Sequence, residues 1–150
     1  MGVRKRSASS VPSILLVDDN SNGLKARKTV LEEQGYNIVT ASNGADALEH
    51  FATGRFNVVV TDYKMPKMDG LELIGKLRAR EPGLPIVLIS GFVDSLGLNE
   101  ENTKADAVIQ KSAHEVSHLC HAVMRLLRQK TPRKPAAEKP IPKAKRQTAT

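Results

Sequence analysis

The chain has 150 residues, which is enough for one domain with a substantial hydrophobic core. Its net charge of +7 lies at the two ends, because residues 1–11 carry +3 and residues 131–150 carry +5, which leaves −1 for residues 12–130. A near-neutral body argues against a nucleic-acid-binding face on the domain. The single cysteine, Cys120, excludes an internal disulfide and a cysteine metal cluster. We expect a cytoplasmic protein, since no apolar run approaches the roughly 20 residues of a membrane span and the N-terminus lacks the apolar core of a secretory signal.

Composition divides the chain into three parts. Residues 1–11 are polar and basic, so we expect a disordered lead. Residues 131–150 are rich in proline, lysine and alanine without periodicity, so we expect a disordered basic tail. Residues 12–130 contain the periodic apolar sequence and are the predicted domain.

Apolar and β-branched runs alternate with helical patterns along this domain. We predict strands at 14–17, 36–41, 56–62, 85–90 and 105–110. We predict five helices, one from Asn20 or Ser21 to Gly35 and the others at 45–52, 70–80, 91–104 and 112–130. The segment 91–104 is expected to be short or irregular, because glycines and asparagines interrupt its pattern. Regular alternation predicts a parallel sheet covered on both faces, in the flavodoxin-like doubly wound α/β fold of strand order 2-1-3-4-5.

Polar residues mark the expected helix ends. Asn43 and Asp69 are good N-caps for the helices that follow them. Gly35 stands where a helix ends in a left-handed residue. Ser112 and Glu115 have the spacing of a capping box at the start of the last helix.

Carboxylates end two of the predicted strands. Asp18 and Asp19 follow the first strand, and Asp62 ends the third. In the order 2-1-3-4-5 these two strands are neighbours, roughly 4.8 Å apart, so their terminal carboxylates can share one small ion. Carboxylates that lie this close repel one another unless a cation intervenes. A hard divalent cation such as Mg²⁺ is the natural partner for them.

A hydroxyl and an ammonium are expected at the same edge of the sheet. Ser90 ends the fourth predicted strand and Lys111 follows the last one. Together with three acids and a metal, they indicate a site for an oxyanion that carries more charge than one carboxylate. A phosphoryl group on Asp62 is such an oxyanion.

Taken in order, these motifs resemble those of a response-regulator receiver domain of two-component signalling, over about residues 12–130. The matching residues are Asp18-Asp19, Asp62, Met65-Pro66, Met68-Asp69-Gly70, Ser90 and Lys111. The resemblance implies that Asp62 accepts a phosphoryl group from the phosphohistidine of a sensor histidine kinase or a histidine phosphotransfer protein. It implies that Ser90 moves to bond a phosphoryl oxygen and that Lys111 pairs with the phosphoryl group.

The resemblance also implies a magnesium site. Asp19 and Asp62 would ligate Mg²⁺ together with the backbone carbonyl of Lys64, and Asp18 would act mainly through water. The protein would then be a phosphoacceptor and not an enzyme, with self-catalysed phosphotransfer and slow autodephosphorylation as its only chemistry.

Three positions depart from the family pattern. Ser112 follows Lys111 where the family usually has proline, often after a cis bond. The peptide bond between Lys111 and Ser112 is therefore either trans, with a shifted Lys111 side chain, or cis at a cost of about 3–4 kcal/mol. Val108 replaces an aromatic residue that rotates in many receivers, and Phe92 is a candidate substitute. Lys64 lies beside the path of an attacking water, and we expect its ammonium to contact the phosphoryl group or a nearby acid.

Several functions are compatible with these motifs. The leading hypothesis is a single-domain phosphoacceptor that signals through an unidentified downstream protein, because only 20 residues follow Lys130. One alternative is a degenerate receiver that acts as a phosphorylation-independent interaction module, given Val108 and Ser112. A Mg²⁺-dependent phosphohydrolase would need a cap insertion that the chain lacks. Another alternative is an adaptor that binds nucleic acid through the basic tails. The sequence is also compatible with a homodimer.

Overall fold

A five-stranded parallel sheet runs through the middle of the domain. The computed structural model describes residues 11–130, so the predicted lead up to residue 10 and the predicted tail at 131–150 lie outside the described residues. The strands are β1 (Ser13–Val17), β2 (Asn37–Ala41), β3 (Val58–Asp62), β4 (Ile86–Ser90) and β5 (Ala107–Gln110). Their order is β2-β1-β3-β4-β5, and every neighbouring pair is parallel. The predicted fold class and strand order are confirmed.

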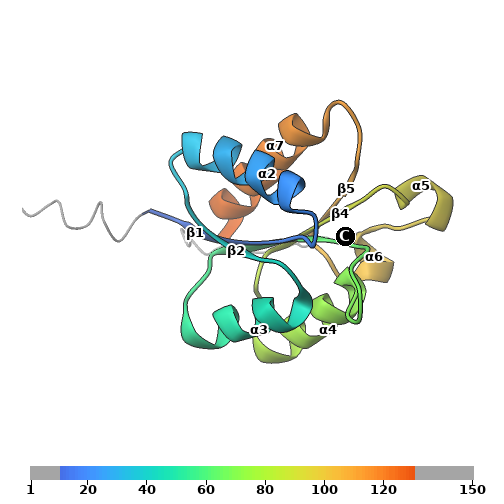
Figure 1. Cartoon of the computed structure of the whole chain (residues 1–150), viewed down its shortest axis with the longest axis horizontal. Helices are drawn as coiled ribbons and strands as arrows, with labels where there is room; N and C mark the ends of the chain where they lie inside the picture. Colours follow the sequence, from blue (N-terminus) through green and yellow to red (C-terminus); the bar gives the residue numbers. More distant parts are fainter. Residues whose placement is uncertain (1–10, 131–150) are drawn as a thin grey trace, which may run out of the picture.

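Four helices cover the two faces of this sheet (Figure 1). Helices α2 (Ser21–Glu33) and α7 (Glu115–Lys130) lie side by side on one face. Helices α3 (Gly44–Thr53) and α4 (Gly70–Arg80) lie on the other. No helix among the described residues is long and apolar enough to cross a membrane.

The irregular segment 91–104 forms two short helices in place of one. They are α5 (Val93–Leu96) and α6 (Glu100–Thr103). Gly97 adopts a left-handed φ of 64° that ends α5, and the side chain of Asn99 caps α6. The described residues therefore contain six helices, and the predicted number of five is wrong because a glycine and a new cap split one segment.

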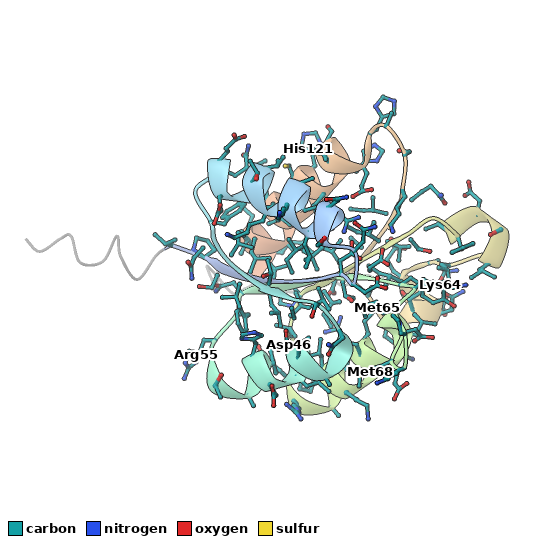
Figure 2. The ribbon with its side chains drawn as sticks, in the orientation of Figure 1. Asp46, Arg55, Lys64, Met65, Met68 and His121 are labelled. Atoms are coloured by element: carbon teal, nitrogen blue, oxygen red, sulfur yellow. The ribbon has the colours of Figure 1, made fainter. Side chains whose placement is uncertain are left out.

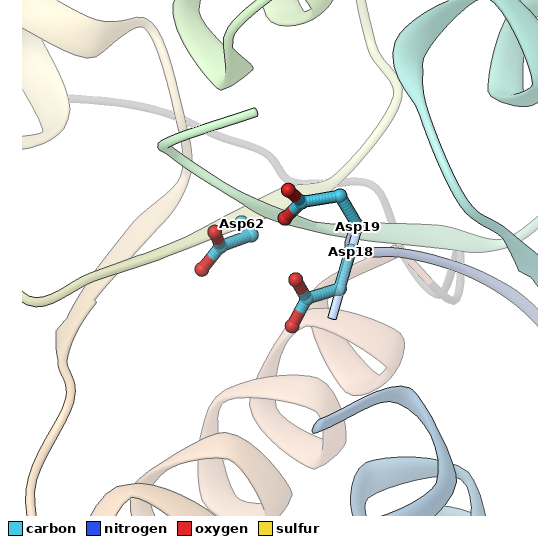
Figure 3. Close-up of side chains that lie close together, drawn as sticks. All are labelled: Asp18, Asp19 and Asp62. Atoms are coloured by element: carbon cyan, nitrogen blue, oxygen red, sulfur yellow. The ribbon is translucent and has the colours of Figure 1, made fainter. Parts of the chain in front are cut away.

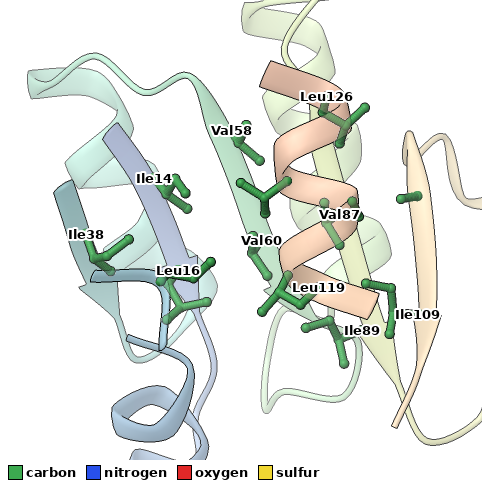
Figure 4. Close-up of a cluster of buried hydrophobic side chains, with 14 residues drawn as sticks. Ile14, Leu16, Ile38, Val58, Val60, Val87, Ile89, Ile109, Leu119 and Leu126 are labelled. Carbon is green, nitrogen blue, oxygen red and sulfur yellow. The ribbon is translucent and has the colours of Figure 1, made fainter. Parts of the chain in front are cut away.

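Apolar side chains fill the space on both sides of the sheet. Val60 and Ile89 face the cluster that contains Leu119 of α7 (Figure 4). Val59 faces the cluster on the α3 and α4 side, which contains Leu73. Neighbouring residues of a strand point to opposite faces, so a central strand with helices on both sides needs a continuous apolar run. This requirement explains why β3 and β4 are buried throughout.

Side-chain caps form at the predicted starts of α2, α3 and α4. Asn43 accepts the N–H of Asp46 at 2.7 Å, and Asp69 accepts the N–H of Glu72 at 2.9 Å. Asn20, the first of its two candidates, caps α2. These caps place the loops that lead into the helices.

The predicted capping box at the last helix does not form. Ser112 Oγ accepts the N–H of His114 at 3.1 Å, and α7 begins only at Glu115. The Glu115 carboxylate accepts a hydrogen bond from Arg27 of α2 at 2.6 Å. A guanidinium is a stronger partner for a carboxylate than a neutral backbone N–H, so Glu115 links two helices and does not cap its own.

Candidate functional site

Three carboxylates meet at the carboxyl end of the sheet (Figure 3). Strands β1 and β3 pair in a register that sets Val17 beside Thr61, so the acids that follow each residue are neighbours. One carboxylate oxygen each of Asp18, Asp19 and Asp62 lies within 4.8 Å of the others. Asp18 and Asp62 are buried and Asp19 is exposed. The fold thus brings together the acids that the sequence placed on two separate strands.

Lys111, the residue after β5, reaches the acid cluster. Its Nζ lies 2.7 Å from Asp62 Oδ1 as an ion pair. No cis peptide bond is present between residues 11 and 130, so the bond from Lys111 to Ser112 is trans. The lysine nevertheless lies against Asp62, and the shift that we expected for a trans bond does not separate the pair.

Ser90 lies at the same edge, at the end of β4. Its side chain is buried, and its Oγ accepts the backbone N–H of Phe92 at 2.9 Å. The register of β4 and β5 sets Ser90 beside Gln110, the residue before Lys111. Ser90 and Lys111 therefore lie at the carboxyl ends of two adjacent strands.

Lys64 lies over an aromatic ring and not against a nearby acid, and its expected contact with a phosphoryl group stays a prediction. Its Nζ lies 5.2 Å from the centre of the Phe92 ring, a cation–π contact. Among the described residues it forms no ion pair with an acid. Figure 2 shows Lys64 at the side of the domain nearest to α5. Val108 is partly buried against the core on the α3 and α4 side. Phe92 is an exposed aromatic residue next to the site, since its backbone N–H donates to Ser90.

The charge of Asp62 is disfavoured in this environment. Burial raises the pKa of its carboxyl above the ordinary value, because a low-dielectric surrounding penalises the charged form. The charge of Asp18 raises this pKa as well, while Lys111 and Arg27 act in the opposite direction. A cation among the carboxylates would favour the ionised form of Asp62.

The donor set fits a hard divalent cation such as Mg²⁺. All three side chains offer carboxylate oxygens, the ligands that this ion prefers. Asp62 Oδ1 is buried and, apart from its ion pair with Lys111, accepts no hydrogen bond of ordinary geometry from the described residues. An oxygen in this state retains a lone pair for a cation.

The backbone around Asp62 is closely packed against the start of α4. The N–H of Gly70 donates to the carbonyl of Tyr63 at 2.7 Å. A Cβ at Gly70 would lie 2.5 Å from the Asp62 carbonyl oxygen and 2.9 Å from the Leu88 side chain. Only glycine allows this approach, which holds the loop after β3 against the sheet.

Arg27 is a residue of the site that the sequence analysis did not assign. Its Nη1 lies 2.6 Å from Asp18 Oδ2, and its Nε lies 2.6 Å from Glu115 Oε2. A signal was present in the sequence, because Arg27 shares a helical face with Leu24 and Leu31. A face of this kind is normally apolar, so a charged residue on it indicates a buried partner.

Residues 14–124 match the response regulator receiver domain family. The chain belongs to this family. The receiver is similar to the response regulator receiver protein CpdR of Brucella abortus (strain 2308), at 30% identity over 115 residues that cover 76% of this chain and 95% of that protein. It is also similar to the C4-dicarboxylate transport transcriptional regulatory protein DctD of Rhizobium meliloti (strain 1021), at 35% identity over 86 residues. That match covers 57% of this chain but 19% of DctD, so the receiver spans about a fifth of that regulator.

The receiver also resembles solved structures. The response regulator TrrA of Thermotoga maritima, in complex with Mg²⁺ and BeF, has a TM-score of 0.70 and 33% sequence identity. The match covers 77% of this chain and 99% of that chain. The sheet and the helices on its two faces therefore belong to the shared receiver fold.

Proposed function

We propose that this receiver accepts a phosphoryl group on Asp62 from a histidine kinase or a histidine phosphotransfer protein, and signals by binding a downstream protein. The observation that carries the proposal is the surroundings of Asp62. Its buried carboxylate lies between two further acids and the Lys111 ammonium, at the carboxyl edge of a parallel sheet. This edge is where ligands bind in open α/β folds.

The proposed step transfers a phosphoryl group from a histidine nitrogen to a carboxylate oxygen of Asp62. A carboxylate oxygen of Asp62 attacks the phosphorus of the phosphohistidine, the O–P bond forms and the P–N bond breaks. The histidine nitrogen leaves with the electron pair of the broken bond and takes up a proton. Lys111 balances the charge of the transferred group, and the Ser90 hydroxyl donates a hydrogen bond to one of its oxygens. Slow attack by water on the phosphorus then breaks the O–P bond, releases inorganic phosphate and restores the Asp62 carboxylate.

The proposed magnesium ligands are Asp19, Asp62 and the backbone carbonyl of Lys64. When bound, the ion neutralises negative charge on the phosphoryl oxygens. Asp18 Oδ1 accepts the N–H of Asn20 at 3.0 Å, and Asp18 Oδ2 is paired with a guanidinium. Because both oxygens already have protein donors, an indirect role through water suits Asp18.

Intact mass spectrometry with acetyl phosphate and Mg²⁺ tests the proposal. We expect the wild-type chain to gain one phosphoryl group and the Asp62→Asn variant to gain none. Asp69→Asn is the matched control, since Asp69 caps α4 and asparagine is an equally good cap. A wild-type chain without any gain would favour the phosphorylation-independent interaction module. An equal gain in Asp62→Asn would place the acceptor elsewhere.

The nucleic-acid alternative depends on tails that lie outside the described residues.

A further inference from the structure

A buried arginine joins the acid cluster to a helix that the proposed phosphotransfer does not use. The Arg27 side chain is 6% exposed and the Asp18 side chain 2%. The other partner of Arg27, Glu115, has a side chain that is 15% exposed. Both contacts measure 2.6 Å, so one guanidinium is shared by two carboxylates.

The three residues come from separate parts of the fold. Asp18 follows β1, Arg27 lies in α2, and Glu115 is the first residue of α7. Helices α2 and α7 lie side by side on one face of the sheet (Figure 1). The shared guanidinium is therefore a direct connection between the acid cluster and the contact of these two helices.

Arg27 and a bound metal ion would both interact with the negative charge of Asp18. Asp18 Oδ2 pairs with Arg27, and a carboxylate oxygen of Asp18 lies within 4.8 Å of oxygens of Asp19 and Asp62. Two cations this close repel each other, and the repulsion is strong in a buried site because solvent screens it little. The guanidinium has a second carboxylate to move toward, on α7.

We infer that Arg27 is a positioning residue that competes with the divalent cation for the negative charge of Asp18, and that Glu115 sets the strength of this competition. The inference rests on the proposed magnesium site. Coupling between two sites is reciprocal, so cation binding weakens the pairing of Arg27 with Asp18 and favours its pairing with Glu115. The occupancy of the acid cluster is thereby transmitted to the α2–α7 contact.

A purely structural role predicts a different outcome. Removing either Arg27 or Glu115 breaks the same bridge between α2 and α7, and both changes then lower stability. Their effects on metal affinity differ in sign only if the charge of Arg27 opposes the cation. Opposite shifts in Mg²⁺ affinity therefore separate the two roles.

Calorimetric titration of the full chain with Mg²⁺ measures these shifts. We expect Arg27→Gln to bind Mg²⁺ about fivefold or more tightly than the wild type, because the competing cation is gone. We expect Glu115→Gln to bind about fivefold or more weakly, because Arg27 then pairs with Asp18 alone. Lys28→Gln and Glu32→Gln are the matched controls, since these residues form an exposed pair on the same helix at 3.5 Å. Both controls should stay within about twofold of the wild type.

A second variant and a second measurement keep the test decisive if Arg27→Gln does not fold. Replacing Arg27 and Glu115 together by leucine removes both charges and keeps an apolar helix contact, and this variant should also bind Mg²⁺ more tightly. In the wild type, the Nε–H NMR signal of Arg27 should shift when Mg²⁺ is added. The Nε–H signal of Arg78, which donates to the Lys104 carbonyl at 3.1 Å, should not shift.

The outcomes distinguish this inference from the proposed function. A wild-type chain that binds no Mg²⁺ overturns both. A wild-type chain that binds Mg²⁺, with variants that shift in the same direction or not at all, overturns only the role of Arg27 and Glu115.

Discussion

The Ser90 hydroxyl oxygen accepts the backbone N–H of Phe92 at 2.9 Å, which connects a buried side chain to an exposed aromatic residue. Ser90 is 1% exposed and Phe92 is 41% exposed. A serine hydroxyl can accept one hydrogen bond and still donate its own proton, so Ser90 can bond a phosphoryl oxygen as well. Since Val108 has no ring to rotate, this link offers a route from the acid cluster to the surface.

The link predicts that Phe92 senses the site through Ser90. Addition of beryllofluoride and Mg²⁺ should shift the backbone amide NMR signal of Phe92 in the wild type, because the Ser90 hydroxyl reorients toward the bound group. The shift should be much smaller in Ser90→Ala, which lacks the acceptor. Ser117→Ala, an exposed serine of α7, should respond like the wild type. An equal shift in Ser90→Ala would exclude this route.

Asp62 should make the domain less stable as the pH rises, in the absence of metal. Its pKa is raised in the folded state, mainly by burial, above the ordinary value of 3.8. In the pH window between the ordinary pKa and the raised pKa of the folded state, the folded state binds more protons than the unfolded state. The free energy of unfolding therefore falls as the pH rises through this window. Above the window, Asp62→Asn should therefore melt at a higher temperature than the wild type. The advantage should disappear below pH 3.8, where the carboxyl is protonated in both states.

Thermal melts of the wild type and of Asp62→Asn, from below pH 3.8 to neutral pH, test this prediction. Mg²⁺ at neutral pH provides the control, since it should raise the melting temperature of the wild type more than that of Asp62→Asn. A variant that is less stable than the wild type above the window would show that the ion pair with Lys111 outweighs the burial of the carboxylate.

Lys64 is expected to slow the loss of the phosphoryl group. Its ammonium lies over the Phe92 ring, and we expect this pair to restrict the approach of water to Asp62. Lys64→Ala should shorten the lifetime of phosphoryl-Asp62 by about two- to fivefold, in proportion to the strength of an exposed cation–π contact. Phe92→Leu should act in the same direction, because it removes the ring that holds Lys64. The decay of phosphorylated protein, followed by intact mass, measures the lifetime, and an unchanged value in Lys64→Ala would refute this role.

Two glycines of α4 should respond in opposite ways to alanine. A Cβ at Gly70 would lie 2.5 Å from the Asp62 carbonyl oxygen, whereas a Cβ at Gly75 would meet nothing within 4 Å. Gly70→Ala should lower the free energy of unfolding by about 1–3 kcal/mol, because the start of α4 must move away from β3. Gly75→Ala should raise it by about 0.5–1 kcal/mol, since alanine is the better helix former. Urea denaturation measures both, and a neutral Gly70→Ala would show that the loop is not held tightly.

Local patterns of the sequence were sufficient for the strands, for the starts of α2, α3 and α4, and for the edge of the sheet at which the acids gather. A buried strand must be apolar along its length, and a cap such as Asn43 or Asp69 bonds an N–H three residues away. Alternation of strands and helices then leaves few ways to arrange a parallel sheet, and it sets Asp18 and Asp62 at neighbouring strand ends.

Contacts between distant residues required the folded chain. The spacing of Ser112 and Glu115 is that of a capping box, yet Glu115 pairs with Arg27, which lies 88 residues earlier. The choice depends on how α2 and α7 are rotated against each other, and no local pattern records this rotation. The same holds for Lys64, for which we expected a phosphoryl group or a nearby acid and whose ammonium lies over an aromatic ring. The energy of a charged side chain depends on every group that approaches it, so only the tertiary structure decides its partner.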